Sequence, residues 1–461
     1  MPPPFAHSIN NGHLEVNMAQ ISLAVLGGSS VATPAFVQAL LDWAGHAHDR
    51  SALRLVLLGR SARKLAQVRA VCERMVQEAQ PGITVEASTD LRAGLWRVDY
   101  ILNQMRVGGL EARAHDETFP QALGMPGEET VGPGGFANAL RTIPVVNAAL
   151  RIASEVAPNA VVLNLTNPAS IVQYAATRYA HSNIISLCDS PITLGNELAA
   201  LVEKPRASIN IGYLGMNHLG WVVSLCDAER DYMDLALERI ERLAYLGVDA
   251  AYIRASRAIP LPYVRYYLHP ERILAQQQGK TPRAHQLQSL EQELLSRYET
   301  IDVGTRFIAS NPLASARFAS DLLASESITS ISEAVAKRGA IWYSAIVVPV
   351  LDALINNHAS NWIVSVANKN LIPWLSSDTV VEVPCMIDSR GAHPLPVPVY
   401  LLPPELRTLL YGLALYEELA SRAIVEQNRD LALRSLLAHP LIRTIERAQA
   451  VLKAVWPAGG I

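Results

Sequence analysis

The 461-residue chain has no run of about 18 uninterrupted apolar residues, so the sequence predicts no membrane span. Residues 1–19 lack the basic stretch and apolar run of a secretory signal, and we expect a flexible extension there. The four cysteines have no paired spacing, which argues against a disulfide framework and favours a reducing cytoplasm. No lysine or arginine block stands out and the formal net charge is −3, so composition argues weakly against a nucleic-acid partner.

The composition, with 50% hydrophobic and 18% charged residues, suits a large, well-buried soluble enzyme. A chain of this length predicts two domains. Through about residue 200, apolar strands alternate with helices, which predicts an α/β fold with a doubly wound, Rossmann-type parallel sheet. Beyond that point helices dominate, and a few strands complete a mostly helical α+β domain. We therefore expect a dinucleotide-binding domain at 20–200 and a second domain at 201–461.

The apolar patterns place the individual elements. Strands are expected at 21–26, 53–58, 83–87, 98–102, 161–165, 184–187, 209–214 and 222–225, with an extended stretch at 379–398. Helices are expected at 35–43, 64–79, 136–153, 234–245, 284–298, 332–357 and 405–428.

The most polar stretch of the chain runs from Leu102 to Val146. It contains arginines, carboxylates and glycines that packing does not explain: Arg106, Arg113, Arg141, Asp116, Glu117, Glu128, Glu129, Gly108, Gly109, Gly132, Gly134 and Gly135. A glycine-rich polar loop after a strand is where α/β folds bind ligands, and long loops in compact domains are usually functional. A solvated surface loop is the alternative.

The first strand leads into a glycine turn, Gly27-Gly28-Ser29-Ser30, and then a helix start. Thr33 suits the N-cap of that helix. Free N–H groups at a helix N-terminus favour a pyrophosphate. The G-x-G-x-x-G motif is incomplete here, so an ordinary strand–helix turn is equally compatible.

Two other strand ends carry polar residues of interest. NAD-binding folds usually place an acidic residue after the second strand, whereas this chain has Gly59-Arg60. An arginine there can pair with the 2′-phosphate of NADP, or it can be a solvated residue at a helix start. Asn167, after a later strand, is either a cap or a ligand contact.

Several residues could carry chemistry. Cys188 and His218 each follow an apolar strand, and a thiolate with an imidazole can bind a divalent ion. Two ligands would make an open, catalytic site, although a core cysteine and a satisfied polar histidine are the commoner explanation. Tyr263 could act as a base beside a cation, or belong to an aromatic packing patch. Arg106 and Arg283 could clamp an anionic substrate, or form surface salt bridges.

Seven strings follow one another along the chain in a telling order. They are NQMRVGGLEAR, GEETVGPGGFANALRTIP, LTNPAS, LCDSP, GMNHLGW, PLPYVRYY and VVEVPCMIDSRGAHPL. With these strings in this order, the chain resembles glycoside hydrolase family 4 from about residue 21 to beyond 438. This family comprises the NAD- and divalent-metal-dependent glycosidases that include the 6-phospho-glucosidases. The resemblance implies a lactate/malate dehydrogenase-like architecture, a homodimer or homotetramer, and a second domain for substrate, metal and oligomer contacts.

The resemblance also implies roles for individual residues. Cys188 and His218 fall on the ligands of the metal, usually manganese, and Tyr263 falls on the proposed catalytic base. Asp189 falls where α-specific members carry a proposed acid. The other implied roles are substrate binding by Arg106, Asn167 and Arg283, the last at the sugar phosphate, and cofactor binding by Gly27, Gly28, Ser29, Ser30 and Asn103.

The implied reaction removes hydride from C3 of the sugar, deprotonates C2 with help from the metal, eliminates the aglycone, adds water and returns the hydride. No opposed carboxylate pair is needed. Two features depart from a uniform match, because Arg60 leaves NAD or NADP open and Asp189 is α-like. The longer strings point to a 6-phospho-β-glucosidase. The alternatives are an α-specific member of the family and an NAD(P)-dependent dehydrogenase without net hydrolysis.

Overall fold

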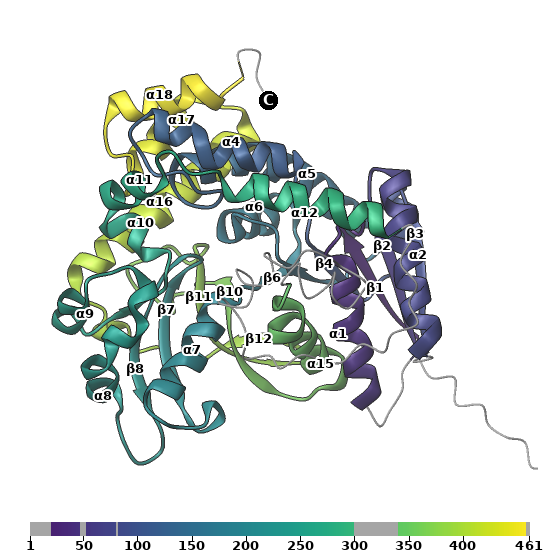
Figure 1. The fold of residues 1–461 in the computed structure, drawn as a ribbon, viewed down its shortest axis with the longest axis horizontal. Helices are drawn as coiled ribbons and strands as arrows, with labels where there is room; N and C mark the ends of the chain where they lie inside the picture. The colour runs from purple at the N-terminus through teal and green to yellow at the C-terminus, as the bar shows by residue number, and fades with distance from the viewer. Residues whose placement is uncertain (1–19, 47–51, 80–81, 299–339, 458–461) are drawn as a thin grey trace, which may run out of the picture.

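The computed structural model describes residues 20–46, 52–79, 82–298 and 340–457. The expected extension at 1–19 and the beginning of the expected helix at 332–357 lie outside these residues. The described segments form one mixed sheet of twelve strands surrounded by helices (Figure 1). In this part of the chain, every helix is too short or too polar to cross a membrane.

One half of the sheet is parallel, with the order β3-β2-β1-β4-β5-β6. Its strands are β1 (Ile21–Leu26), β2 (Leu53–Leu58), β3 (Ile83–Ser88), β4 (Tyr100–Asn103), β5 (Val161–Asn164) and β6 (Asn183–Ser186). The helices along this half are α1 (Thr33–His46), α2 (Ala62–Ala79), α3 (Leu91–Gly94), α4 (Gly109–Ala122), α5 (Gly132–Val156), α6 (Ala169–Ala180) and α7 (Ser190–Leu201). The order reverses direction between β1 and β4, as in dinucleotide-binding sheets. The predicted Rossmann-type fold is confirmed.

The other half of the sheet is antiparallel and comes from the chain after residue 200. Its strands are β7 (Asn210–Met216), β8 (Leu219–Cys226), β9 (Ile259–Pro260), β10 (Ser360–Ala367), β11 (Val380–Asp388) and β12 (Gly391–Pro394). In Figure 1, β1, β2 and β3 lie to the right and the β7–β8 hairpin to the lower left. The division into two domains near residue 200 stays a prediction.

The two halves join where β10 pairs with β6, at Ser365 and Ser186. The buried amide of Gln173, on α6, lies at this junction. Its Nε2 donates to the carbonyl oxygens of Ile184 and Ser365, at 3.1 and 3.0 Å, and its Oε1 accepts the N–H of Ser186 at 2.8 Å. One side chain therefore satisfies backbone groups from both halves.

The polar stretch from 102 to 146 is mostly helical, which corrects the expectation of a long loop. Helix α4 begins after Gly108, whose φ of +81° is easily adopted only by glycine, and α5 begins at Gly132 rather than at Phe136. The acidic residues Asp116 and Glu117 are buried on α4, where arginines pair with them. These polar residues therefore form buried ion pairs on a helix and do not belong to a solvated loop.

The second half of the chain also departs from two expectations. The expected helix at 234–245 is broken into α8 (Met233–Glu238) and the 3-10 helix η2 (Ile240–Leu246), with Leu243 outside helical geometry. The described part of the expected helix at 332–357 is a π-helical turn, η3 (Tyr343–Val347), followed by α15 (Val348–Asn356). The remaining helices are α9 (Ala250–Ser256), α10 (Val264–Leu268), α11 (Pro270–Gln277), α12 (Arg283–Arg297), α16 (Pro404–Glu426), α17 (Arg429–Ala438) and α18 (Ile445–Val455).

Helix α16 packs on α6 and carries a buried carboxyl group, Glu417. Ser170 Oγ donates a 2.5 Å hydrogen bond to its Oε1, and its Oε2 has no partner within the described chain. Burial raises the pKa of Glu417 to about 8, and the bond from Ser170 lowers it only in part. The carboxyl group is therefore mostly protonated in the folded protein at neutral pH.

We expect Glu417→Gln to gain stability relative to the wild type as the pH rises. The folded pKa lies above the ordinary value of 4.5, so the folded state binds more protons than the unfolded state between the two. The stability from protonated Glu417 is fully present below pH 4.5 and is lost as the pH rises through about 8. Urea unfolding measures the free energy of unfolding at pH 5 and 8. Relative to the wild type, this free energy should rise in Glu417→Gln by on the order of a few kcal/mol between the two pH values. The exposed neighbour Glu418→Gln is the control, and an equal pH dependence in both variants would contradict the assignment.

Candidate active site

The predicted cofactor, substrate and metal residues meet at one edge of the sheet. Gly27 follows β1, Asn103 ends β4, Asn167 follows β5 and Cys188 follows β6. Because the carboxyl ends of parallel strands lie on the same edge, the fold brings these residues together. The Asn167 side chain is half-buried and makes no hydrogen bond to the described residues, so its amide is available to a ligand.

The turn after β1 is closely packed. A Cβ atom on Gly27, where φ is +85°, would lie 3.0 Å from the carbonyl oxygen of Gln104, and one on Gly28 would lie 2.8 Å from the β2 backbone. The N–H groups of Ser29 and Val31 form no hydrogen bond within the described chain, and they lie just before the N-terminus of α1. Free N–H groups at this place suit the pyrophosphate of a dinucleotide.

The turn after β2 lies against this first turn. A Cβ atom on Gly59 would lie 2.9 Å from Ser29 Oγ, which explains why a residue without a side chain stands there. Ser30 stabilises the first turn itself, because its N–H donates to Gly27 and its Oγ accepts the N–H of Ala32, at 3.1 and 3.2 Å. Arg60 is exposed beside this contact, and its role with NAD or NADP stays a prediction.

Asn103 is buried, and its amide is bonded within the protein. Its Nδ2 donates to Asn164 Oδ1 at 2.8 Å, and Nδ2 of Asn164 donates to Ser186 Oγ at 2.9 Å. This ladder of side chains joins the ends of β4, β5 and β6. Asn103 therefore fixes the ends of these strands next to the expected cofactor site.

Gln104 was not expected from the sequence, yet it connects three segments. Its Nε2 donates to the carbonyl oxygen of Gly27 at 3.3 Å and to Thr33 Oγ1 at 3.0 Å, and its Oε1 accepts the hydroxyl of Tyr343. Thr33, the expected N-cap, is already inside α1. The residue after β4 therefore fixes the glycine turn against α1 and η3.

His218 lies at the tip of the two-residue hairpin between β7 and β8. Its φ of +65° is uncommon for a residue other than glycine. Its ring stacks on the ring of Tyr263, with centroids 3.6 Å apart and planes at 4°. Nδ1 lies 2.8 Å from Thr130 Oγ1. Burial lowers the pKa of His218 to about 3 although Glu129 opposes the shift, so the imidazole is neutral.

Tyr263 precedes α10 and belongs to the same cluster. Burial raises its pKa well above the ordinary value, and the charges of Glu128, Cys188 and Asp189 raise the pKa further. The hydroxyl therefore keeps its proton unless a positive charge enters the site. A tyrosine in this environment becomes a base only beside a cation.

Cys188 and Asp189 complete the cluster. Burial raises the pKa of the Cys188 thiol, and the charges of Glu382 and Asp189 add to the shift. Burial also raises the pKa of Asp189. A thiol next to several carboxyl groups becomes a thiolate when a cation binds beside it.

The donor set fits an open divalent-metal site. Across the described residues, no three histidine, cysteine or acidic side chains converge on one point. A metal here would take Cys188 and His218 and leave its other positions to water or substrate oxygens. The surrounding negative groups favour a cation, and a thiolate with an imidazole suits a borderline transition metal.

Arginines and carboxylates form a network beside this cluster. Arg106 and Arg113 both pair with the buried Glu129, the latter at 2.9 Å, and Arg113 also pairs with Glu117 at 2.7 Å. Arg283 stands at the start of α12, next to Ala284, whose N–H donates to Glu117 Oε2 at 2.9 Å. Partial burial, and then the nearby charge of Arg113, lower the pKa of Arg283. The fold therefore brings the two predicted anion-binding arginines, Arg106 and Arg283, to the same network.

Two family models match most of the chain. The model described as family 4 glycosyl hydrolase matches residues 22–204, and the model of its C-terminal domain matches residues 213–442. This chain belongs to glycosyl hydrolase family 4. The resemblance inferred from the seven sequence strings is thereby confirmed.

Known relatives of this family 4 hydrolase carry names of both anomeric types. A probable 6-phospho-beta-glucosidase of Bacillus subtilis is 27% identical over 449 residues, covering 94% of this chain and 95% of its own. A 6-phospho-alpha-glucosidase of Lacticaseibacillus paracasei is 28% identical over 396 residues, covering 82% and 83%. The names leave the anomer open.

Solved structures extend the likeness to the whole fold. The 6-phospho-beta glucosidase of Thermotoga maritima, solved with NAD and glucose-6-phosphate, has a TM-score of 0.79 at 25% identity, covering 95% of this chain and 98% of its own. Another structure of that protein contains manganese as well. Lactate dehydrogenase from Eimeria maxima has a TM-score of 0.51 at 12% identity, covering 88% and 96%, so the dehydrogenase-like architecture is confirmed at the level of fold.

The family 4 site contains a further buried carboxyl group that was not predicted, Glu382 on β11. It accepts hydrogen bonds from the hydroxyl of Tyr213 at 2.6 Å and from Asn217 Nδ2 at 3.3 Å, and burial raises its pKa to about 7. A Cβ atom on Gly220 would lie 1.9 Å from the Tyr213 hydroxyl, so the glycine makes room for this bond. The sequence did contain a signal, because an acidic residue inside the apolar strand VVEVPC needs a buried partner.

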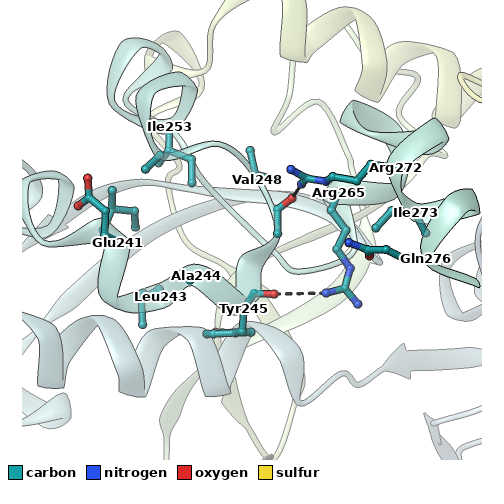
Figure 2. Close-up of a pocket in the computed structure, with 13 residues that line it drawn as sticks. Glu241, Leu243, Ala244, Tyr245, Val248, Ile253, Arg265, Arg272, Ile273 and Gln276 are labelled. Atoms are coloured by element: carbon teal, nitrogen blue, oxygen red, sulfur yellow. Dashed lines mark hydrogen bonds between the residues drawn. The ribbon is translucent and has the colours of Figure 1, made fainter.

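A separate hollow of about 540 Å³ lies between η2, α9, α10 and α11 of the hydrolase (Figure 2). Arg265 donates to the carbonyl oxygen of Tyr245 at 3.2 Å, and Arg272 donates to that of Gly247. The predicted site residues do not line it, although Tyr263 is only two residues before Arg265. It is therefore distinct from the candidate active site.

We expect Glu129→Gln to destabilise the hydrolase by about 3 kcal/mol, because Arg113 and Arg106 would lose their shared buried carboxylate. Urea unfolding at neutral pH measures this change. Glu86→Gln, which breaks the more exposed pair with Arg54, is the matched control and should cost less than about 1 kcal/mol. Equal losses in the two variants would count against the network.

Proposed function

We propose that this family 4 hydrolase cleaves 6-phospho-β-glucosides with NAD and a divalent cation, manganese for preference, as cofactors. The observation that carries the proposal is the stacking of His218 on Tyr263, whose pKa is raised by burial and by the charges of Cys188 and Asp189 at the carboxyl end of β6. A redox cofactor and a cation are useful together in a glycosidase only when a C–H bond must be made labile. The Thermotoga maritima relative, solved with NAD and glucose-6-phosphate, supports the same chemistry.

When bound, NAD would accept hydride from C3 of the sugar and the cation would polarise the oxygens on C2 and C3. Cys188 and His218 would hold the cation at the site. Tyr263 would take the C2 proton, because a cation beside it opposes the charges that otherwise keep its hydroxyl protonated. Asp189, whose pKa is raised by burial, would give a proton to the leaving oxygen.

The arginine network would bind the phosphate of the substrate. A guanidinium matches phosphate geometry bidentately, and Arg106 and Arg283 keep N–H groups beyond their contacts with Glu129 and Gln286. Asn167 offers an amide to a sugar hydroxyl. The turn Gly27 to Ser30 would bind the pyrophosphate of the dinucleotide.

An α-specific 6-phospho-glucosidase is the second candidate, and Asp189 favours it. This residue is half-buried, and its charge adds to the burial that raises the pKa values of Cys188 and Tyr263, so it can serve as an acid, which is the role that the family resemblance gives it in α-specific members. The longer matching strings favour the β-anomer, so the proposal keeps the β-glucoside first.

A panel of nitrophenyl α- and β-glucosides, with and without a 6-phosphate, tests the proposal. Each would be assayed with NAD or NADP, and with Mn²⁺ or EDTA. We expect nitrophenol release from the β-glucoside 6-phosphate that needs NAD and Mn²⁺ and stops with EDTA. Stoichiometric NADH formation without nitrophenol release would instead identify a dehydrogenase, and release without either cofactor would reject the mechanism.

A cytoplasmic homodimer or homotetramer belongs to the same proposal. Large exposed side chains on η4 (Val399–Leu401) and α16 support the assembly, because Tyr400 is 76% and Tyr411 53% exposed and could pack against a second copy of the chain. Light scattering on the purified protein would measure the assembly, and a monomer at micromolar concentration would reject this part.

A further inference from the structure

A chain of hydrogen bonds runs from His218 to a buried carboxyl group. Nδ1 of His218 lies 2.8 Å from Thr130 Oγ1, and that hydroxyl donates to Glu128 Oε2. The same Oε2 accepts the backbone N–H groups of Thr130 and Val131, at 2.5 and 2.9 Å. Three donors therefore converge on one oxygen of Glu128.

Counting protons along this chain fixes the tautomer of the histidine. Oε2 of Glu128 accepts two backbone N–H groups, so this oxygen carries no proton of its own. The Thr130 hydroxyl must therefore donate to it. A hydroxyl has one hydrogen, and this one points at Glu128, which leaves a lone pair towards His218. Nδ1 of His218 must then carry the hydrogen, and its Nε2 must carry a lone pair.

We propose that Thr130 and Glu128 are positioning residues that hold His218 as the Nδ1–H tautomer, with Nε2 open to a divalent cation. The identity of that cation rests on the function proposed above, whereas the tautomer does not. Outer-shell partners of this kind orient metal-binding histidines and set which nitrogen binds. Tyr263 adds the second constraint, because its parallel ring fixes the plane of the imidazole.

Side chains from two helices hold the backbone around Glu128 and Thr130 in place. Gln277, on α11, makes a pair of hydrogen bonds with the backbone N–H and carbonyl of Gly127, at 2.9 and 2.7 Å. Asn138, on α5, donates to the carbonyl oxygen of Glu129 at 2.9 Å. A Cβ atom on Gly127 would lie 1.9 Å from the carbonyl oxygen of Glu117, so this close approach requires glycine. Thr130 is therefore presented to His218 from a fixed backbone.

Three variants separate positioning from general stability. Thr130→Val keeps the shape but removes the hydroxyl, and Thr130→Ser keeps the hydroxyl. Thr142→Val is the matched control, because this buried threonine on α5 also loses one hydrogen bond, to Asn138 Oδ1 at 2.9 Å, and its hydroxyl bonds to no predicted site residue. Thermal unfolding of all three would confirm that they fold.

Two measurements follow on the full chain. The first is the ¹⁵N spectrum of the histidine rings in metal-free protein, with His218 assigned by its loss in His218→Gln. The second is the dissociation constant of Mn²⁺ alone, from the paramagnetic resonance of the free ion. We expect Nδ1 protonation in the wild type, Thr130→Ser and Thr142→Val. We expect mixed or Nε2 protonation in Thr130→Val, with Mn²⁺ binding about 10- to 100-fold weaker.

Each outcome bears on the proposal separately from the function. Nε2 protonation of His218 in the wild type overturns the proposal whatever the activity. Unchanged tautomer and unchanged Mn²⁺ affinity in Thr130→Val overturn it too. If the wild type shows the Nδ1–H tautomer but binds no Mn²⁺, the proposed function fails while the role of Thr130 and Glu128 in setting the tautomer stands.

Discussion

Cys188→Ser should lower metal-dependent hydrolysis more than about 100-fold while leaving the fold intact. Serine is close in size to cysteine, but its hydroxyl does not ionise near neutral pH and is a poor ligand for a transition metal. Loss of an outer-shell partner already costs 10- to 100-fold in typical metal sites, and loss of a ligand itself should cost at least as much. Activity after chelation and re-addition of Mn²⁺ measures the effect, together with the affinity for Mn²⁺.

The chain offers a matched control for this substitution. Cys226, at the end of β8, is half-buried like Cys188 and is also a free thiol, but it is outside the cluster with His218 and Tyr263. Cys226→Ser should keep wild-type activity and Mn²⁺ affinity. Full activity of Cys188→Ser after the same treatment would remove Cys188 as a metal ligand.

Tyr263→Phe should slow exchange of the C2 hydrogen of the sugar by about 100-fold or more, the usual contribution of a general base. Phenylalanine keeps the ring that stacks on His218 and removes only the hydroxyl, so Mn²⁺ affinity should stay within about twofold of the wild type. Incorporation of solvent deuterium at C2, followed by NMR of the sugar product, measures the step directly.

Tyr266→Phe is the control for the loss of a nearby hydroxyl. Its ring centroid lies 6.4 Å from that of Tyr263, and burial raises its pKa to about 12. We expect deuterium incorporation in this variant to match the wild type within about threefold. An unchanged incorporation rate in Tyr263→Phe would exclude Tyr263 as the base.

The sequence was sufficient to predict the parallel half of the sheet, because each strand there is a short apolar run followed by a helix. It was misleading between Leu102 and Val146, where glycines and charged residues are typical of a loop. Asp116 and Glu117 are instead buried on α4 by ion pairs with Arg141 and Arg113, which are contacts that a local pattern does not contain. Tertiary pairing, and not local composition, decides the structure of this segment.

In the candidate site too, the roles of residues depend on tertiary contacts that the local sequence does not reveal. Cys188, His218 and Tyr263 were singled out by residue type, but their roles came from the family resemblance, because spacing alone was compatible with core residues. Thr130 was missed, since its partner His218 is 88 residues away in the chain. Glu382, 169 residues from Tyr213, needed the antiparallel half of the sheet to be placed before its neighbours could be known.

The junction at Gln173 has a consequence for engineering this enzyme. Chimeras made by exchanging the segment before residue 204 with that of a relative would have to recreate the seam between β6 and β10, including an amide at position 173. A fragment ending at that point would expose the unpaired backbone of β6 as a template for foreign strands, and we expect it to aggregate.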